Sequence, residues 1–190
     1  MKRLHQCVLI GSFLPLCWLG MMAVHELGHI AAGCATGGTV TRVVLHPLAI
    51  SRTDVAPNPR PLVVVWAGPL VGVIIPLLIW GAIISLRVPG DYLTRFFAGF
   101  CCIANGAYIG VGSFDGIGDA GEMLRHGSPI WVLWMFGVLT IPVGFLCWHR
   151  LGPHFGLGQS HGQVSARAAY VSLTMLTVVL MLAFSLSSQE

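Results

Sequence analysis

The residues best suited to chemistry gather in the stretch AVHELGHIAAG, which contains His25, Glu26 and His29 in the spacing H-E-x-x-H. Successive residues of an α-helix turn by about 100°, so the two histidines lie about 40° apart on one face and their imidazoles can converge on one metal ion. Glu26 lies beside them, where a carboxylate can accept a proton from a zinc-activated water without ligating the metal. The spacing predicts a Zn²⁺ site with His25 and His29 as ligands and Glu26 as the catalytic base.

The setting of this motif favours a metal over a chance spacing. The apolar stretch from about residue 4 to 41 contains a single charged residue, Glu26. Ionisable groups in a membrane span cost on the order of 3 kcal/mol each on insertion scales, so three of them together need a compensating partner. A zinc ion is the natural partner for this group.

Two histidines and a water leave a tetrahedral zinc ion one protein ligand short. If the spans alternate in direction, the segment GVGSFDGIGDAGEML after the third apolar stretch emerges on the same membrane face as the end of the histidine-bearing helix. Asp119 is the preferred third ligand because it stands where a helix could begin, a position that acidic side chains favour. Asp115 is the alternative, although the glycines around it make its backbone flexible.

Two further groups of potential ligands do not fit a metal site. His149, His154 and His161 lie in the loop between the fourth and fifth apolar stretches, on the opposite membrane face, and we expect interfacial or exposed side chains. The six cysteines form no C-x-x-C pair and stand almost entirely in apolar runs. They are therefore expected to be small core residues rather than disulfides or thiolate ligands.

Composition places these residues in a membrane protein. Of the 190 residues, 55% are hydrophobic and only 9% are charged, with a mean hydropathy of +0.81, whereas soluble proteins carry about a quarter charged residues. The net charge of +3 comes from scattered basic residues, which excludes nucleic acid as a partner and leaves the lipid bilayer. Five stretches are long enough to span the bilayer: about 4–41, 61–86, 95–115, 127–149 and 168–189.

We therefore predict an all-α, multi-pass integral membrane protein with about five transmembrane helices, in a plasma membrane or bacterial inner membrane. The β-branched runs TVTRVVLH and LAISRT meet at Pro47 and predict a small β-hairpin at residues 39–53. The segment DVAPNPRP that follows predicts a stiff, extended connector. No internal repeat marks a second domain, so residues 1–190 are expected to form one integral membrane domain.

The chain has an HELGH motif near the end of an early membrane helix, then a β-like segment, AGPL in the next span and an Asn-bearing helix that leads to an Asp-Gly motif. This order of features resembles the site-2 proteases, which are intramembrane zinc metalloproteases. The matching pieces are residues 25–29, 39–53, 67–70, Asn105 and 119–124, the last reading D-A-G-E-M-L against the family's D-G-G-x-x-L. The resemblance identifies about residues 20–125 as a metalloprotease core and leaves about 128–190 as accessory transmembrane helices.

The sequence also departs from the family pattern. In that pattern the asparagine precedes a proline and lies about eight residues before the aspartate. Here no proline stands between Asn105 and the aspartates, and Asp115 and Asp119 are ten and fourteen residues further on. Phe114-Asp115-Gly116 also mimics the apolar-Asp-Gly form of the motif, so the third ligand stays a choice between Asp119 and Asp115.

The resemblance implies hydrolysis of peptide bonds in a transmembrane protein substrate, with Zn²⁺ held by His25, His29 and an aspartate. Asn105 is then a candidate contact to the substrate or transition state, and its alternative is an interhelical hydrogen bond. The strands at 39–53 are candidates to hold an unwound substrate by strand addition, and their alternative is an ordinary interfacial hairpin.

Two other functions compete with proteolysis. A membrane metal transporter needs ligands along several spans, and the only acidic residue within the predicted spans near the motif is Glu26. A catalytically silent relative that acts as a binding partner has no reason to keep Glu26 beside both histidines. Both alternatives are therefore disfavoured.

Overall fold

The computed structural model describes residues 2–47 and 51–187 of the chain. In this part, five helices are long and apolar enough to cross a membrane: α1 (Lys2–Ala35), α2 (Pro61–Ser85), α3 (Asp91–Asp115), α5 (Ile130–Trp148) and α6 (Ala166–Ser187). The chain is thus a multi-pass integral membrane protein, and the prediction of about five transmembrane helices is confirmed.

The helix ends follow local signals in the sequence. α2 begins at Pro61, whose fixed φ suits the first turn of a helix. α3 is bounded by Gly90 and Gly116, both left-handed at φ 93° and 62°, a conformation that glycine adopts without strain. The helix starts at Asp91 rather than near residue 95 as predicted, because an acidic residue in the first turn stabilises a helix N-terminus.

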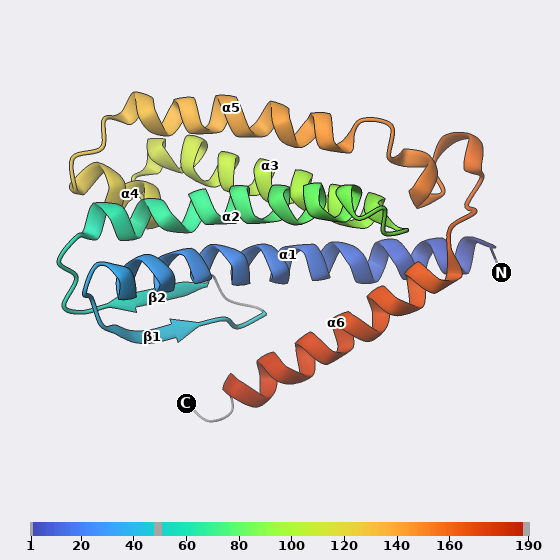
Figure 1. The fold of residues 1–190 in the computed structure, drawn as a ribbon, viewed down its shortest axis with the longest axis horizontal. Helices are drawn as coiled ribbons and strands as arrows, with labels where there is room; N and C mark the ends of the chain where they lie inside the picture. Colours follow the sequence, from blue (N-terminus) through green and yellow to red (C-terminus); the bar gives the residue numbers. More distant parts are fainter. Residues whose placement is uncertain (1, 48–50, 188–190) are drawn as a thin grey trace.

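Four of the long helices, α1, α2, α3 and α5, lie side by side, whereas α6 contacts α1 near its beginning and then diverges from the bundle (Figure 1). The closest approach of α3 and α5 occurs at glycines. A Cβ added to Gly137 would lie only 2.9 Å from the carbonyl oxygen of Gly106. Small residues at such crossings let helix backbones pack closely in a membrane.

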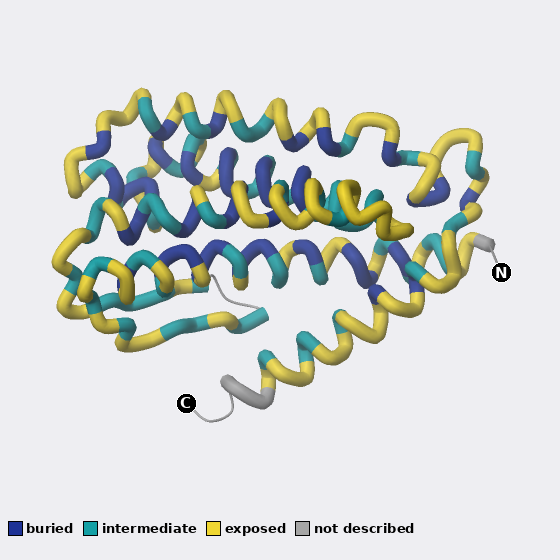
Figure 2. The backbone as a smooth tube through the Cα atoms, viewed as in Figure 1, coloured by how far each residue is buried: buried dark blue, intermediate teal, exposed yellow. Residues whose placement is uncertain are grey.

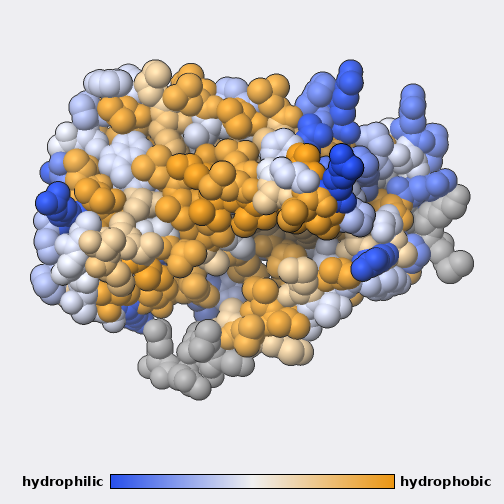
Figure 3. Space-filling view, in the orientation of Figure 1, coloured by the Kyte–Doolittle hydropathy of each residue, from blue (hydrophilic) through white to orange (hydrophobic). Residues whose placement is uncertain are grey.

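Burial in the bundle has the pattern of a lipid-facing protein. Buried residues line the surfaces where the helices meet, while the outer faces are exposed (Figure 2). These exposed faces are apolar: Val138 and Leu146 on α5 are 67% and 69% exposed. Figure 3 shows hydrophobic side chains over the middle of the molecule and hydrophilic ones toward its two ends. The apolar middle therefore suits contact with lipid.

The strands β1 (Val40–Val44) and β2 (Arg52–Val55) form an antiparallel pair that lies beside the C-terminal half of α1 (Figure 1). The predicted hairpin after the first helix is confirmed, but its second strand runs further than expected. β2 extends into the predicted connector because Thr53 and Val55 supply β-branched side chains. Residues 48–50 of the LAISRT run lie outside the described residues.

A short helix, α4 (Gly118–Arg125), follows α3 and packs back against α2 and α3. Its buried residues Ala120 and Met123 join a cluster with Val65, Ile109 and Leu133. This return brings the acidic segment after α3 over the C-terminal half of α1, as the alternation of spans predicts.

The opposite end of the bundle is closed by the 3-10 turns η1 (Gly152–Phe155) and η2 (Gly158–Ser160). There Leu151 and Phe155 pack against Leu9, Phe13 and Cys17 of α1. We call this end of the bundle the aromatic end, after the rings that pack around the cluster: Phe13, Tyr92, Phe96, Trp148 and Phe155.

Candidate metal centre

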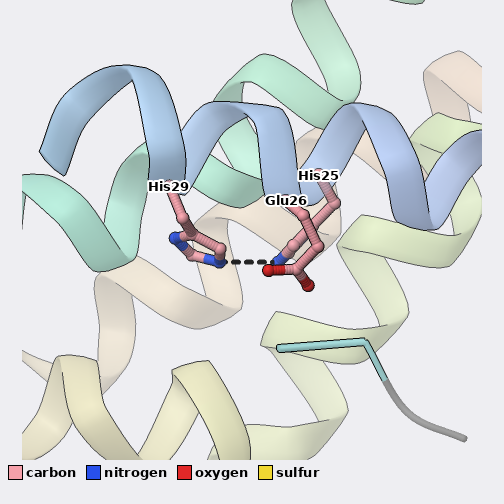
Figure 4. Close-up of side chains that lie close together, drawn as sticks. All are labelled: His25, Glu26 and His29. Atoms are coloured by element: carbon pink, nitrogen blue, oxygen red, sulfur yellow. Dashed lines mark hydrogen bonds between the residues drawn. The ribbon is translucent and has the colours of Figure 1, made fainter. Parts of the chain in front are cut away.

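His25, Glu26 and His29 lie in the C-terminal half of α1 and are 6%, 3% and 6% exposed. The nitrogen and oxygen atoms that they offer as ligands lie within 4.8 Å of one another. Figure 4 shows the three side chains leaving the same side of the helix, with the Glu26 carboxylate beside His25. The predicted buried His-Glu-His group, able to hold a metal ion, is confirmed.

Asp119 approaches the two imidazoles from the first turn of α4. Its Oδ2 lies 2.7 Å from His25 Nε2 and 3.3 Å from His29 Nε2, and the two Nε2 atoms are 3.1 Å apart. Ligands about 2.1 Å from a tetrahedral zinc ion lie about 3.4 Å from one another. The three atoms are therefore spaced as a compact ligand set.

The far sides of both imidazoles are held by hydrogen bonds. His25 Nδ1 donates to Asn105 Oδ1 at 2.7 Å, and His29 Nδ1 donates to the Val64 carbonyl at 2.8 Å. The Asn105 amide is itself oriented, because its Nδ2 donates to the Cys101 carbonyl at 2.9 Å. Since a carbonyl oxygen only accepts, Nδ1 of each histidine carries a proton and Nε2 is left to face the site.

This arrangement calls for a positive charge among the three facing atoms. When both imidazoles are neutral, two Nε2 lone pairs and an Asp119 oxygen point at one another within 3.3 Å. Three acceptors at such distances repel one another unless a cation, either a proton or a metal ion, lies among them. Two imidazoles and one carboxylate form a donor set that zinc uses in hydrolytic enzymes, so the residues fit that metal.

Asp119 is ionised in this setting. Burial raises the pKa of its carboxyl group, but hydrogen bonds and charge interactions with His25 and His29 outweigh burial and bring the pKa to about 2. The carboxylate is therefore available as a ligand throughout the neutral pH range.

Glu26 is held by the hairpin rather than by the bundle. Thr53 of β2 donates its hydroxyl proton to Glu26 Oε2 at 2.7 Å. Within residues 2–47 and 51–187, no other hydrogen bond to this carboxylate is found. No sequence pattern predicts this contact, because it depends on where the hairpin docks on α1.

Gly68 of the AGPL motif places α2 directly against the imidazoles. A Cβ at this position would lie 2.4 Å from His29 Nε2 and 2.8 Å from His25 Nε2. On α1, Gly28 immediately precedes His29, and a Cβ there would lie 2.3 Å from the Ala67 carbonyl oxygen. The two helices can approach this closely only because both positions lack side chains.

A cavity of about 1020 Å³ opens onto the ligand set. Every residue from Ser51 to Ala56 lines it, whereas β1 contributes only Arg42 and Val44. Side chains of a strand alternate between two faces, so an unbroken run of lining residues means that the edge of β2 faces the cavity. β1 pairs with the other edge. Among the described residues β2 pairs only with β1, so its other edge borders the candidate metal centre.

The remaining candidate residues do not belong to the ligand set, although Asn105 contacts it. Asp115 is the exposed last residue of α3 and does not line the cavity. Asn105 is only 1% exposed, and its bond to His25 is the interhelical hydrogen bond that the sequence offered as its alternative role. At the opposite end of the bundle, His154 stacks on Tyr92. Four of the cysteines are buried, while Cys7 and Cys34 are exposed.

No protein-family model, curated protein or solved structure matches this chain. The interpretation of the site therefore depends on its motif and its geometry.

Proposed function

We propose that this protein is an intramembrane zinc metalloprotease of the site-2 protease type, which hydrolyses peptide bonds of transmembrane protein substrates. The observation that carries the proposal is the convergence of His25 Nε2, His29 Nε2 and Asp119 Oδ2 on one point, with the Glu26 carboxylate beside them. In this proposal the two histidines and Asp119 bind Zn²⁺, and Glu26 is the catalytic residue.

The bound zinc supplies Lewis acidity, which activates a water molecule and polarises the scissile carbonyl group. His25, His29 and Asp119 would hold the ion, and three protein ligands are the number that catalytic zinc sites use. The hydrogen bonds from Nδ1 of His25 and His29 hold the imidazoles in the tautomer that presents Nε2 to the ion.

Glu26 moves the proton of the reaction. Its Oε1 accepts a proton from the attacking water, whose oxygen forms a bond to the carbonyl carbon. When the carbon–nitrogen bond breaks, Glu26 returns the proton to the departing amine nitrogen, so that it ends the cycle ionised. The hydrogen bond from Thr53 to Oε2 supports the position of the Glu26 carboxylate beside the two histidines.

The substrate must be unwound before attack, because helical carbonyl groups are occupied by backbone hydrogen bonds. The edge of β2 offers backbone groups to such an unwound segment, which would add to the hairpin as a further strand. This edge lies beside Glu26, since the hydrogen bond from Thr53 joins the two. The cavity of about 1020 Å³ has room for several residues of an extended peptide.

The lining of this cavity supports a division of the chain into a core and accessory helices. All of its residues fall between Trp18 and His126. We propose that about residues 20–125 form the metalloprotease core, that about 128–190 are accessory helices, and that residues 1–190 act as one integral membrane domain.

Glu26→Gln should abolish proteolysis, by about 10³-fold or more, while zinc content stays near one per chain, because Glu26 transfers protons and does not ligate. The experiment compares the membrane proteomes of cells that contain the native protein or the Glu26→Gln variant. We expect at least one membrane protein to be cleaved only with the native protein. Ser51→Ala, which changes another side chain lining the cavity, is the matched control and should retain cleavage.

Three results would contradict the proposed function. The first is a native protein that contains no metal after purification and zinc addition. The second is cleavage by purified Glu26→Gln protein of a substrate reconstituted with it. The third is the absence of any cleavage that distinguishes the two proteomes.

A further inference from the structure

Tyr108 stands beside the metal centre without a part in the ligand set. It follows Asn105 by three residues on α3, which places both side chains on one helix face, and it lines the same cavity as Glu26. Its ring contacts His25 edge to face, with ring centroids 5.9 Å apart. Tyr108 is 39% exposed and lines the cavity, so a molecule in the cavity can reach it.

The hydroxyl group of Tyr108 is available as a hydrogen-bond donor. The backbone N–H of Asp119 donates to the Tyr108 oxygen at 3.0 Å, which occupies an acceptor position and leaves the O–H donor unused. In the described part of the chain, no hydrogen bond takes this proton. A hydroxyl that accepts one hydrogen bond becomes a stronger donor in a second, because the two bonds polarise each other.

The chain leaves space for this hydroxyl. A Cβ at Gly118 would lie 2.2 Å from the Tyr108 oxygen, and Gly118 has a φ of 60°, in the left-handed region that favours glycine. The next residue is Asp119, so the turn that leads into α4 brings a ligand and the phenol together. This close fit fixes the hydroxyl next to the ligand set.

The polar groups that touch the ligand atoms are committed elsewhere, and Arg52, Arg125 and His126, which also line the cavity, pair with Asp54 and Glu122. The Nδ1 protons of His25 and His29 are donated to Asn105 and Val64, and the Asn105 amide is buried behind His25. Glu26 and Asp119 are acceptors when ionised. A peptide whose carbonyl oxygen gains negative charge during attack needs a hydrogen-bond donor, and Tyr108 is positioned to be that donor.

We propose that Tyr108 is a further catalytic residue, whose hydroxyl donates a hydrogen bond to the carbonyl oxygen of the scissile peptide as negative charge develops there. The inference rests on the proposed proteolytic function. Loss of one such donor lowers kcat by about 10²-fold to 10³-fold in enzymes that stabilise an oxyanion. A donor of this kind acts on the transition state and contributes little to the binding of the ground state.

The test compares two zinc-directed dipeptide inhibitors on the zinc-loaded, full-length protein. N-phosphoryl-Leu-Trp has a tetrahedral, negatively charged phosphoryl group and resembles the transition state, whereas mercaptoacetyl-Leu-Trp binds zinc through sulfur and presents no oxyanion. Tyr108→Phe should lower the affinity for the phosphoryl compound by about 100-fold and the affinity for the thiol compound by less than about threefold. Tyr170→Phe, on α6 against His5, is the control and should change neither affinity.

Zinc content and affinity for the thiol compound distinguish a catalytic role of Tyr108 from a role in positioning Asp119. If the Tyr108→Phe protein loses zinc, or if its affinity for both compounds falls equally, the residue acts by holding Asp119 and the inference is wrong. Unchanged affinity for the phosphoryl compound also overturns it. If the native protein binds zinc but neither compound, the proposed function fails with it.

A second variant addresses the case in which Tyr108→Phe does not fold. Tyr108→3-fluorotyrosine keeps the ring and the hydroxyl and makes the hydroxyl a stronger donor. Measured at a pH at which the fluorophenol stays protonated, this variant should bind the phosphoryl compound more tightly than the native protein, with unchanged affinity for the thiol compound. Equal affinity for the phosphoryl compound in the two proteins would overturn the inference.

Discussion

Histidines and hydrogen-bonding side chains occur at both ends of the bundle, but their surroundings differ. At the metal centre, the imidazoles of His25 and His29 meet at their Nε2 atoms, 3.1 Å apart, while their Nδ1 atoms are held from behind. At the aromatic end, the His154 ring lies flat on Tyr92, with ring centroids 4.7 Å apart and an angle of 12° between the planes. The first arrangement aims ring nitrogens at a point, whereas the second uses ring faces for packing.

The elements that carry these histidines explain the difference. His25 and His29 are four residues apart on one continuous helix, so their directions are fixed relative to each other. His149, His154 and His161 are spread over the end of α5 and two short 3-10 turns, which set no common direction. The presence of histidines near one another in sequence therefore indicates a metal site only when a rigid element aligns them.

The largest effect that tests this comparison is the loss of the metal. His25→Ala or His29→Ala should lower zinc from near one per chain to near zero and abolish cleavage, because each removes one of the three proposed ligands. His154→Ala should retain both zinc and activity. Elemental analysis of the purified proteins measures the zinc content. Loss of zinc in His154→Ala would show that the aromatic end also binds metal and would break the comparison.

The next effect concerns the two aspartates at the end of α3 and the start of α4. We expect Asp119→Ala to weaken zinc binding by more than about 100-fold, which exceeds the loss typical of an outer-shell change. Asp115→Ala should bind zinc as the native protein does, because Asp115 is exposed and lies outside the cavity. Titration against a competing chelator gives both affinities. A full zinc complement in Asp119→Ala together with loss in Asp115→Ala would reverse the assignment.

A smaller effect contrasts one amide from each end. Asn105→Ala removes the hydrogen bond behind His25 and should lower zinc affinity by about 10-fold to 100-fold. Gln6 donates to the Phe155 carbonyl at 2.9 Å at the aromatic end. Gln6→Ala should leave zinc affinity unchanged and lower the free energy of unfolding by about 1 kcal/mol.

Chelator titration and denaturation of the two amide variants in detergent measure these changes. Equal zinc affinity in Asn105→Ala and native protein would mean that the bond behind His25 does not support the ligand. A weakened zinc site in Gln6→Ala would instead couple the two ends of the bundle.

The features that the sequence predicted are those with local causes. Long apolar stretches predict the five spanning helices, and the helical period places His25 and His29 on one face. Alternation of the spans also predicts that the segment with Asp119 returns to the face where the histidines lie. These arguments need only hydropathy, spacing and direction along the membrane normal.

The contacts that orient the site could not be predicted in the same way. The bond from His25 to Asn105 depends on the rotation of α3, and that from His29 to Val64 depends on the crossing of α1 and α2. The bond from Thr53 to Glu26 requires the docked position of β2. Tyr108 resembles an ordinary core aromatic in sequence, although its three-residue spacing from Asn105 was a usable signal.

The deep burial of the ligand set has a consequence for metal exchange. His25 and His29 are each 6% exposed, and α2 closes one side of their rings at Gly68, so in the described structure the cavity is the path along which an ion reaches them. Under the proposed function, peptide, water and zinc share this one entrance. A peptide seated along β2 would then obstruct the departure of the ion and make the residence time of the metal depend on the occupancy of the cavity.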